Sequence, residues 1–252
     1  MILTHFLFYM CYCILYLTLL KFGDFLGKIL NFNDYLLRVL DMNSVLTNIQ
    51  NKSAVDILNE YNSELIYPIN IVDIARKRGF TVSGLNFVDL ENEDVFKELV
   101  HDRGHILGAV FIDDKYAQIL YNTELIEDGR FVDLSEDEKK DNLKKRQRFT
   151  VAHEIAHCAL HMSSNDTVHI EFRNDQANNQ NIRERQANIF AGELLMPTEI
   201  MLKIGKLCNY RFPIDSLSES FFVSRNVVRA RIRYLVETGV FPSNATMYET
   251  VS

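Results

Sequence analysis

The chain has 252 residues, of which 47% are hydrophobic and 24% are charged. This composition is typical of a globular protein with a buried core, and the length allows one domain with an appendage or two small domains. The formal net charge of −7 argues against a protein that coats nucleic acid. The four cysteines have no zinc-ribbon spacing, which favours a reducing compartment.

Residues 1–20 form a nearly continuous apolar run. About 20 helical residues reach ~30 Å, which is enough to cross a bilayer, so this run is a candidate membrane anchor. No Lys or Arg precedes it, which argues against a cleavable signal peptide. Lys21, Lys28 and Arg38 follow it and predict that the remainder of the chain is cytoplasmic.

A second interpretation of this region stays open. Translation starts at Met42 in that case, and residues 1–41 are translated upstream sequence. Hydropathy does not separate the two interpretations. In both, we divide the chain into an apolar N-terminal segment (1–41), a central domain (42–205) and a C-terminal segment (206–252).

The first part of the central domain has mixed periodicity. Helical spacing covers Ala54 to Tyr61 and Ile71 to Arg78, and Thr81-Val82 predicts a strand. Residues 108–122 predict a hairpin that turns around Asp113-Asp114-Lys115. A small sheet of this kind would offer an edge to which an extended peptide can add as a strand. The alternative is that the hairpin is only scaffold.

Residues 123–148 are strongly charged. We interpret the acidic first half as a solvated surface loop, and the basic second half as the start of the next helix or a turn before it. A nucleic-acid contact by the six cations is one alternative. Exposed charge near a cleft is favoured, because the acids precede them so closely. The cations are Lys139, Lys140, Lys144, Lys145, Arg146 and Arg148.

The most informative motif is His153-Glu154-Ile155-Ala156-His157, within a helical stretch free of Pro and Gly over residues 143–161. A helix advances 3.6 residues per turn, so His153 and His157 lie on one face and can share one tetrahedral Zn²⁺. Glu154 is then placed to accept a proton from water at the open position of the metal, as the general base of a peptidase.

A catalytic zinc needs a third protein ligand. Residues 184–197 predict a second helix that ends at Pro197, and Glu184 opens it. Asn188 lies one turn further on the same face and is placed to orient a zinc-bound histidine. Glu193 competes with Glu184, but we interpret it as an exposed acid at the helix end.

Two long segments together resemble the ImmA/IrrE family of metallopeptidases. They are Arg146 to His157 and Glu184-x-x-Ala187-Asn188-x-Phe190-Ala191-x-x-Leu194-Leu195-Met196-Pro197. Tyr67 to Ala75 and Gly79 to Val82 also resemble the family, and the likeness covers roughly residues 50–240.

The resemblance implies zinc bound by His153, His157 and Glu184, with Glu154 as general base. It also implies an α+β fold: a zincin-like domain with a small mixed sheet packed on the HExxH helix, followed by a helix-turn-helix-like segment. Family members are associated with cleavage of helix-turn-helix repressors, which would make such a repressor the protein substrate of this chain.

Other polar residues near the motif have less certain roles. His161 completes an i, i+4, i+8 column, but three successive histidines rarely converge on one ion. We expect it to cap the helix as an imidazolium, or to support the site from outside. The residue that stabilises the transition state is undecided among His101, His105, His169 and Tyr121.

Residues 162–183 are polar and predict a mobile loop between the ligand helices that could gate the cleft.

Residues 215–239 predict a helix, a tight turn capped by Ser224, and a second helix. Arg225, Arg229 and Arg233 share one face of the second helix, which is the outline of a DNA recognition helix. Protein contact or packing is the favoured alternative for this segment.

The leading hypothesis is therefore a cytoplasmic zinc endopeptidase that cleaves a repressor. The main rival is a DNA-binding or protein-binding regulator whose peptidase-like domain senses without cutting. A third possibility is a membrane-attached scaffold with an idle zinc site. The complete set of His153, Glu154, His157 and Glu184 favours the enzyme, because a binding module does not need the base.

Overall fold

The computed structural model describes residues 49–61, 66–87, 105–112, 117–124, 134–162, 168–172 and 182–249. The apolar run at 1–20, Met42 and the predicted turn of the hairpin lie outside these residues. Within the described ranges, no helix combines the length and the apolar character that crossing a bilayer requires.

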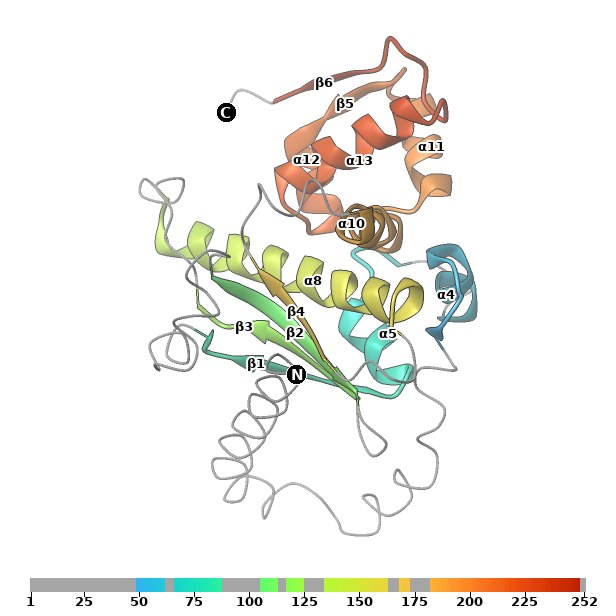
Figure 1. Ribbon diagram of the computed structural model, residues 1–252. Helices are drawn as coiled ribbons and strands as arrows, with labels where there is room; N and C mark the ends of the chain where they lie inside the picture. Colours follow the sequence, from blue (N-terminus) through green and yellow to red (C-terminus); the bar gives the residue numbers. More distant parts are fainter. Residues whose placement is uncertain are drawn as a thin grey trace.

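A four-stranded mixed sheet lies under the helices in Figure 1. Its strands are β1 (Phe80–Leu85), β2 (Ile106–Ile112), β3 (Ala117–Asn122) and β4 (Val168–Phe172), in the order β1-β3-β2-β4. β1 runs parallel to β3, and the β3–β2 and β2–β4 pairs are antiparallel. The predicted α+β class and the small mixed sheet are therefore observed.

The predicted hairpin is confirmed as β2 and β3, with Gly108 opposite Tyr121 and Ile112 opposite Ala117. It lies in the middle of the sheet, because β1 covers one side and β4 the other. Within the described residues, the ends of the sheet are therefore β1 and β4, and the addition of an extended peptide to an edge stays a prediction. β4 differs from the prediction, since residues 168–172 fall in the stretch that was predicted to be a loop.

The longest helix is α8 (Glu136–Leu160), which carries the HExxH motif. It begins seven residues before the predicted helical stretch. Ser135 accepts a hydrogen bond from the N–H of Glu138 while the Glu138 side chain bonds back to Ser135, which is a complete capping box. Part of the predicted acidic loop is thus the first helical turn, where carboxylates are favoured by the helix dipole.

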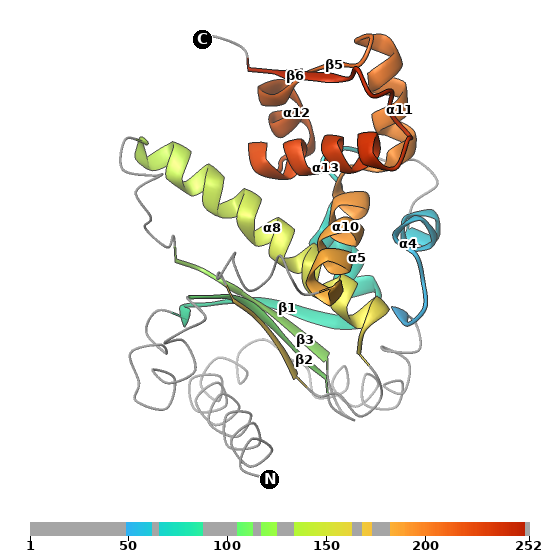
Figure 2. The same ribbon diagram turned by 45° about the horizontal axis from the view of Figure 1, so that its top comes forward.

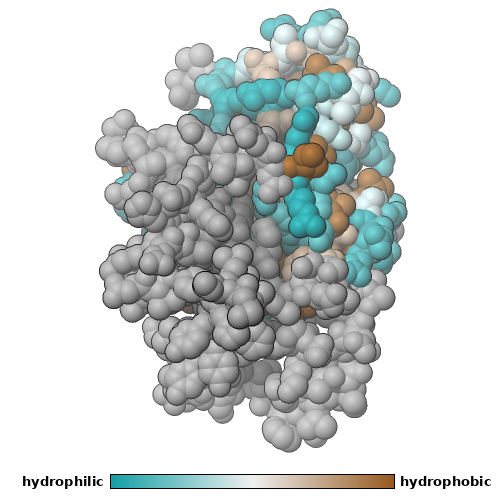
Figure 3. Space-filling view, in the orientation of Figure 1, coloured by the Kyte–Doolittle hydropathy of each residue, from teal (hydrophilic) through white to brown (hydrophobic). Residues whose placement is uncertain are grey.

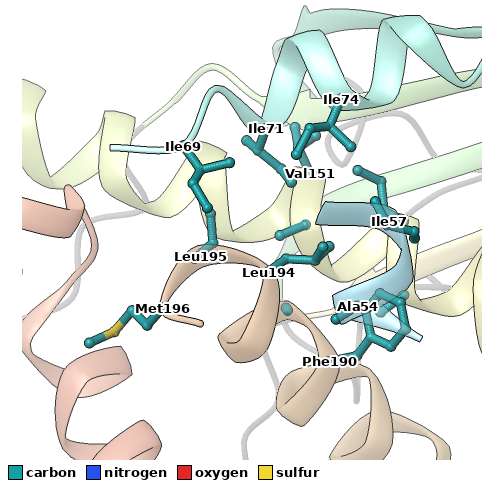
Figure 4. Close-up of a cluster of buried hydrophobic side chains, with 14 of the residues drawn as sticks. Ala54, Ile57, Ile69, Ile71, Ile74, Val151, Phe190, Leu194, Leu195 and Met196 are labelled. Carbon is teal, nitrogen blue, oxygen red and sulfur yellow. The ribbon is translucent and has the colours of Figure 1, made fainter. Parts of the chain in front are cut away.

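Helix α8 lies between the sheet and helix α10 (Ile182–Leu195), as the two views in Figures 1 and 2 show. The short helices α4 (Ala54–Tyr61) and α5 (Ile71–Lys77) pack beside them and confirm the two predicted helices. Apolar side chains from all four helices meet in one core, part of which Figure 4 draws. This packing fixes α10 against α8, so the two segments that carry the motif residues cannot move apart without exposing core.

A C-terminal unit follows α10. It consists of α11 (Thr198–Leu207), β5 (Arg211–Pro213), α12 (Ile214–Phe221), α13 (Arg225–Glu237) and β6 (Thr246–Tyr248). Ser224 caps α13 by accepting a hydrogen bond from the N–H of Val227, as predicted. The visible described surface of this face is mostly hydrophilic with small, separate hydrophobic areas (Figure 3), because the apolar faces of the helices point inward.

The N-terminal half of α8 contacts α12 through two cations. Lys145 is buried and forms ion pairs with Asp141 at 2.7 Å and Glu219 at 2.5 Å. Burial alone would lower the pKa of Lys145, but these hydrogen bonds outweigh it and raise that pKa. Arg148 donates from Nε to the carbonyl oxygen of Phe222 at 3.1 Å, at the end of α12. The expectation of uniformly exposed charge is therefore wrong for these two residues.

Candidate metal centre

His153 and His157 are buried on adjacent turns of α8, with their Nε2 atoms 2.9 Å apart. Helical geometry produces this pairing, because an i, i+4 spacing stacks two side chains on one face. The surrounding turns of the helix carry buried apolar residues that pack into the core. Packing therefore directs both imidazoles toward α10 rather than toward solvent.

Glu184 extends from the first turn of α10 toward the two imidazoles. Its Oε2 atom lies 3.1 Å from Nε2 of His153 and 3.4 Å from Nε2 of His157. Only 12% of its side chain is exposed. The structure thus brings together the three predicted ligands, and they form a group that could hold a metal ion.

The donor set fits zinc in chemistry and in spacing. Two imidazole nitrogens and one carboxylate are a common catalytic zinc set, in which water occupies the fourth position. Ligand atoms about 2.0–2.1 Å from a tetrahedral ion lie about 3.3–3.4 Å from one another. The three observed distances run from 2.9 to 3.4 Å. A single ion at the common centre would therefore need small shifts of these side chains.

Asn188 fixes the tautomer of His153. Its Oδ1 atom lies 3.0 Å from Nδ1 of His153, on the opposite side of the ring from the metal-facing nitrogen. An amide oxygen accepts hydrogen bonds, so Nδ1 carries the proton and Nε2 keeps its lone pair. The expected support of a ligand histidine by Asn188 is thus observed.

Glu154 is completely buried on the side of α8 that faces the sheet. A Cβ atom added to Gly108 of β2 would lie 3.6 Å from Oε1 of Glu154, 2.3 Å from Cγ2 of Thr150 and 2.9 Å from the carbonyl oxygen of Leu120. A larger residue at position 108 would therefore push β2 away from the turn that carries Glu154. The sequence analysis missed Gly108, although a glycine inside a strand pattern is a signal of close backbone approach.

Glu193 takes no part in this centre. It lies at the far end of α10, where its carboxylate pairs with Nη2 of Arg231 and accepts hydrogen bonds from Thr198. Its side chain is only 16% exposed, so the interpretation as an exposed helix-end acid is wrong. Its exclusion from the ligand set is consistent with the structure.

His161 is the C-cap residue of α8, as expected. Its Nε2 atom lies 3.0 Å from the carbonyl oxygen of Arg183. Burial lowers the pKa of His161, which favours the neutral ring over the expected imidazolium. Cys158, next to His157, is buried, and burial raises the pKa of its thiol well above the usual range. This shift favours the protonated thiol.

Four residues were candidates for stabilising the transition state. His101 and the side chain of His169 lie outside the described residues, and His105 is exposed just before β2. The ring of Tyr121 lies over Gly84 of β1, because a Cβ atom added there would be 3.0 Å from Cε2 of Tyr121. Tyr121 is also the cross-strand partner of Gly108, so its side chain lies on the face of the sheet that approaches Glu154, and it stays a candidate.

Comparison with known families supports the resemblance noted from the sequence. Residues 139–233 match the family model Peptidase_M78, described as the IrrE N-terminal-like domain. Over these residues, the chain is similar to the ImmA/IrrE family. The match covers less than half of the 252 residues, but it includes the HExxH motif, Glu184 and most of α13. Searches of curated proteins and of solved structures each found no match.

The matched family is one of metallopeptidases, and the chain has a group of His153, His157 and Glu184 that could hold a metal ion. The matched region crosses from the metal centre into α12 and α13. The C-terminal helices up to residue 233 are therefore part of what the family model describes.

Proposed function

We propose that this protein is a zinc-dependent endopeptidase. One observation carries the proposal: His153, His157 and Glu184 converge within 3.4 Å of one another, and the turn that carries the histidines also carries a buried carboxylate, Glu154. A structural zinc site is usually closed by four protein ligands, whereas three ligands accompanied by a carboxylate that can act as a base are what a catalytic site needs.

Each residue then has a distinct task. The two imidazoles and Glu184 would hold zinc, which would supply Lewis acidity and lower the pKa of a bound water. Glu154 accepts the proton of the attacking water and passes it to the departing amine. Asn188 holds the ring of His153 with its proton on Nδ1, so Nε2 stays available as a ligand. The buried position of Glu154 keeps bulk solvent from competing for its proton.

The substrate that we propose is a helix-turn-helix transcriptional repressor, because the family resemblance is associated with that class. An extended segment of it would have to reach Glu154 between α8 and the sheet. Neighbouring genes offer a practical choice of substrate, namely a repressor encoded next to this protein.

Glu154→Gln tests the enzyme directly. The amide preserves the shape of the side chain but cannot accept the proton, so cleavage should fall about 10²–10⁴-fold while zinc stays bound. Cleavage of the neighbouring repressor is followed on gels with and without a chelator, and bound zinc is measured by elemental analysis. The matched control is Glu199→Gln, the same substitution at an exposed acid on α11. Cleavage at the wild-type rate by the Glu154 variant would remove Glu154 as the base.

The regulator alternative has less support from the C-terminal unit. It needs arginines on α13 that are available for phosphates. Arg225 pairs with Asp215 at 2.5 Å, and Arg229 pairs with Glu249, whereas Arg233 is exposed. A gel shift with operator DNA that weakens in the Arg229→Ala and Arg233→Ala variants would revive the alternative. A chain that binds the repressor but never cuts it would favour it too.

A further inference from the structure

We infer that His161 is a positioning residue for the metal centre: its side chain ties the first turn of α10, and with it Glu184, to the end of α8. The link to zinc affinity rests on the proposed function. The link between the two helices does not, because it is a property of the metal-free fold.

The bond joins the two ligand helices directly beside their ligands. Nε2 of His161 lies 3.0 Å from the carbonyl oxygen of Arg183, the residue before Glu184. On the α8 side, the N–H groups of His161 and Met162 both donate to the carbonyl oxygen of His157, at 2.8 and 3.0 Å. On α8, the link is therefore anchored on the backbone of His157. On α10, it ends at the residue before Glu184.

The first turn of α10 has little apolar packing to hold it. Ile182, Arg183, Arg185 and Gln186 are exposed, and the first buried residue of the helix is Ala187. Further along, Phe190, Ala191, Leu194 and Leu195 are buried in the core. Polar contacts such as the bond from His161 must therefore fix the turn that carries Glu184.

The same bond explains why the third histidine of the column is not a ligand. A carbonyl oxygen only accepts, so Nε2 of His161 must carry the proton. A protonated nitrogen has no lone pair to offer a metal ion. The ring centres of His157 and His161 lie 5.5 Å apart, but the two rings have different roles.

Preorganisation of the third ligand should appear as zinc affinity. Removal of a group that orients a metal ligand typically lowers the affinity for the metal about 10–100-fold. We expect a loss of about this size in His161→Ala. His161→Gln places an amide N–H at a similar distance from the backbone and should restore most of the affinity. Arg185→Ala is the matched control, because it removes an exposed side chain from the same turn of α10 and keeps the carbonyl acceptor of Arg183.

Two measurements on the full chain test the inference. Hydrogen exchange of the zinc-free protein should show faster exchange over residues 184–188 in His161→Ala, and nearly wild-type exchange in His161→Gln and Arg185→Ala. Competition with a chelating dye should give the dissociation constant for zinc, weaker in the alanine variant and recovered in the glutamine variant. Cobalt substituted for zinc should give the same visible spectrum in wild type and His161→Gln, because the ligand set is unchanged.

The inference is overturned if His161→Ala leaves both exchange and zinc affinity unchanged, or if the glutamine variant is as impaired as the alanine variant. A purely structural role would lower the melting temperature of the zinc-free protein without this selective pattern, which also overturns it. If the wild-type chain binds no zinc, the proposed function fails, while the exchange measurement still decides whether His161 holds α10.

Discussion

Helix α10 has a glutamate in its first turn and another in its last turn, and the two carboxylates have different partners. Glu184, at the first turn, points at two imidazole nitrogens, and its neighbours along the helix are mostly exposed. Glu193, at the last turn, is held by Arg231 and by Thr198, and its neighbours are core residues. One carboxylate faces a set of metal donors, whereas the other faces a cation of its own chain.

This contrast separates function from stability within a single helix. Arg231 is almost fully buried and also donates from Nε to the carbonyl oxygen of Met196 at 3.0 Å. The carboxylate of Glu193 and the carbonyl oxygen of Met196 are both partners of this guanidinium, so it ties α13 to the end of α10. The cluster around Glu184 gathers three groups that all donate electron pairs, a combination that an ion completes. We therefore expect substitutions at the two ends to have opposite effects on stability and on metal binding.

The largest effect on stability is expected from Arg231→Met. Removing the guanidinium leaves the carboxylate of Glu193 buried without its cation, which should cost about 3–5 kcal/mol in the free energy of unfolding. Urea denaturation of the zinc-free protein measures it. The zinc affinity of the folded variant should stay near that of wild type.

A double variant sharpens this test. Glu193→Gln combined with Arg231→Met removes both charges and should recover much of the loss, since a neutral pair no longer buries an unpaired ion. A loss below about 1 kcal/mol in the single variant would place this pair with ordinary surface ion pairs.

Glu184→Gln should have the opposite profile. Zinc affinity should fall by more than the ~100-fold that loss of an orienting group typically costs, because a ligand itself is weakened. Zinc at 100 times its dissociation constant stabilises a folded protein by about 2.7 kcal/mol, and this stabilisation should disappear in the variant. Thermal melting with and without zinc measures it. A zinc-dependent rise in melting temperature equal to that of wild type would contradict the assignment of the third ligand.

Asn188→Ala should have an intermediate effect on the same end of α10. Without the amide oxygen, His153 is free to carry its proton on Nε2, so zinc affinity should fall about 10–100-fold. Titration with a competing chelator measures it. Asn188→Asp keeps an acceptor for the Nδ1 proton and should be far less impaired. Equal loss in both variants would mean that the hydrogen bond is not the cause.

Gly108→Ala extends the comparison to the sheet side of the centre. The new methyl would overlap Cγ2 of Thr150 and the carbonyl oxygen of Leu120, so we expect a loss of about 1–3 kcal/mol in stability. Because Glu154 lies on the same side, cleavage should fall more than zinc affinity. Thr150→Ser removes Cγ2, so the double variant Gly108→Ala with Thr150→Ser should regain part of the lost stability. A Gly108→Ala protein of wild-type stability and activity would show that the approach of β2 to α8 is not tight.

The helices and the hairpin were predictable because their signals are local. Ala54 to Tyr61, Ile71 to Arg78 and the strands flanking Asp113 have apolar spacing that matches their final elements. Two local signals were overlooked. Ser135 with Glu138 predicts a helix start, and the alternation Val168-His169-Ile170-Glu171-Phe172 is that of a strand.

The pairing of the two imidazoles, and the common helix face of Glu184 and Asn188, were predictable for a related reason. His153 and His157 need only the period of one helix, and Asn188 lies one turn from Glu184 on another. The burial of Lys145 and the pairing of Glu193 with Arg231 were not predictable in this way. Their partners are 74 and 38 residues away, so no local pattern signals the contact.

The sequence by itself determined which side chains share a helix face, because helix geometry depends only on spacing along the chain. It therefore determined the pair of imidazoles and the base beside them. Only the tertiary structure decided that the Glu184 carboxylate lies against that pair and that the Glu193 carboxylate pairs with Arg231, since contacts between helices do not follow from the spacing along either helix. It also decided how closely β2 approaches Glu154, because the contact depends on the absence of a side chain on a strand distant in sequence.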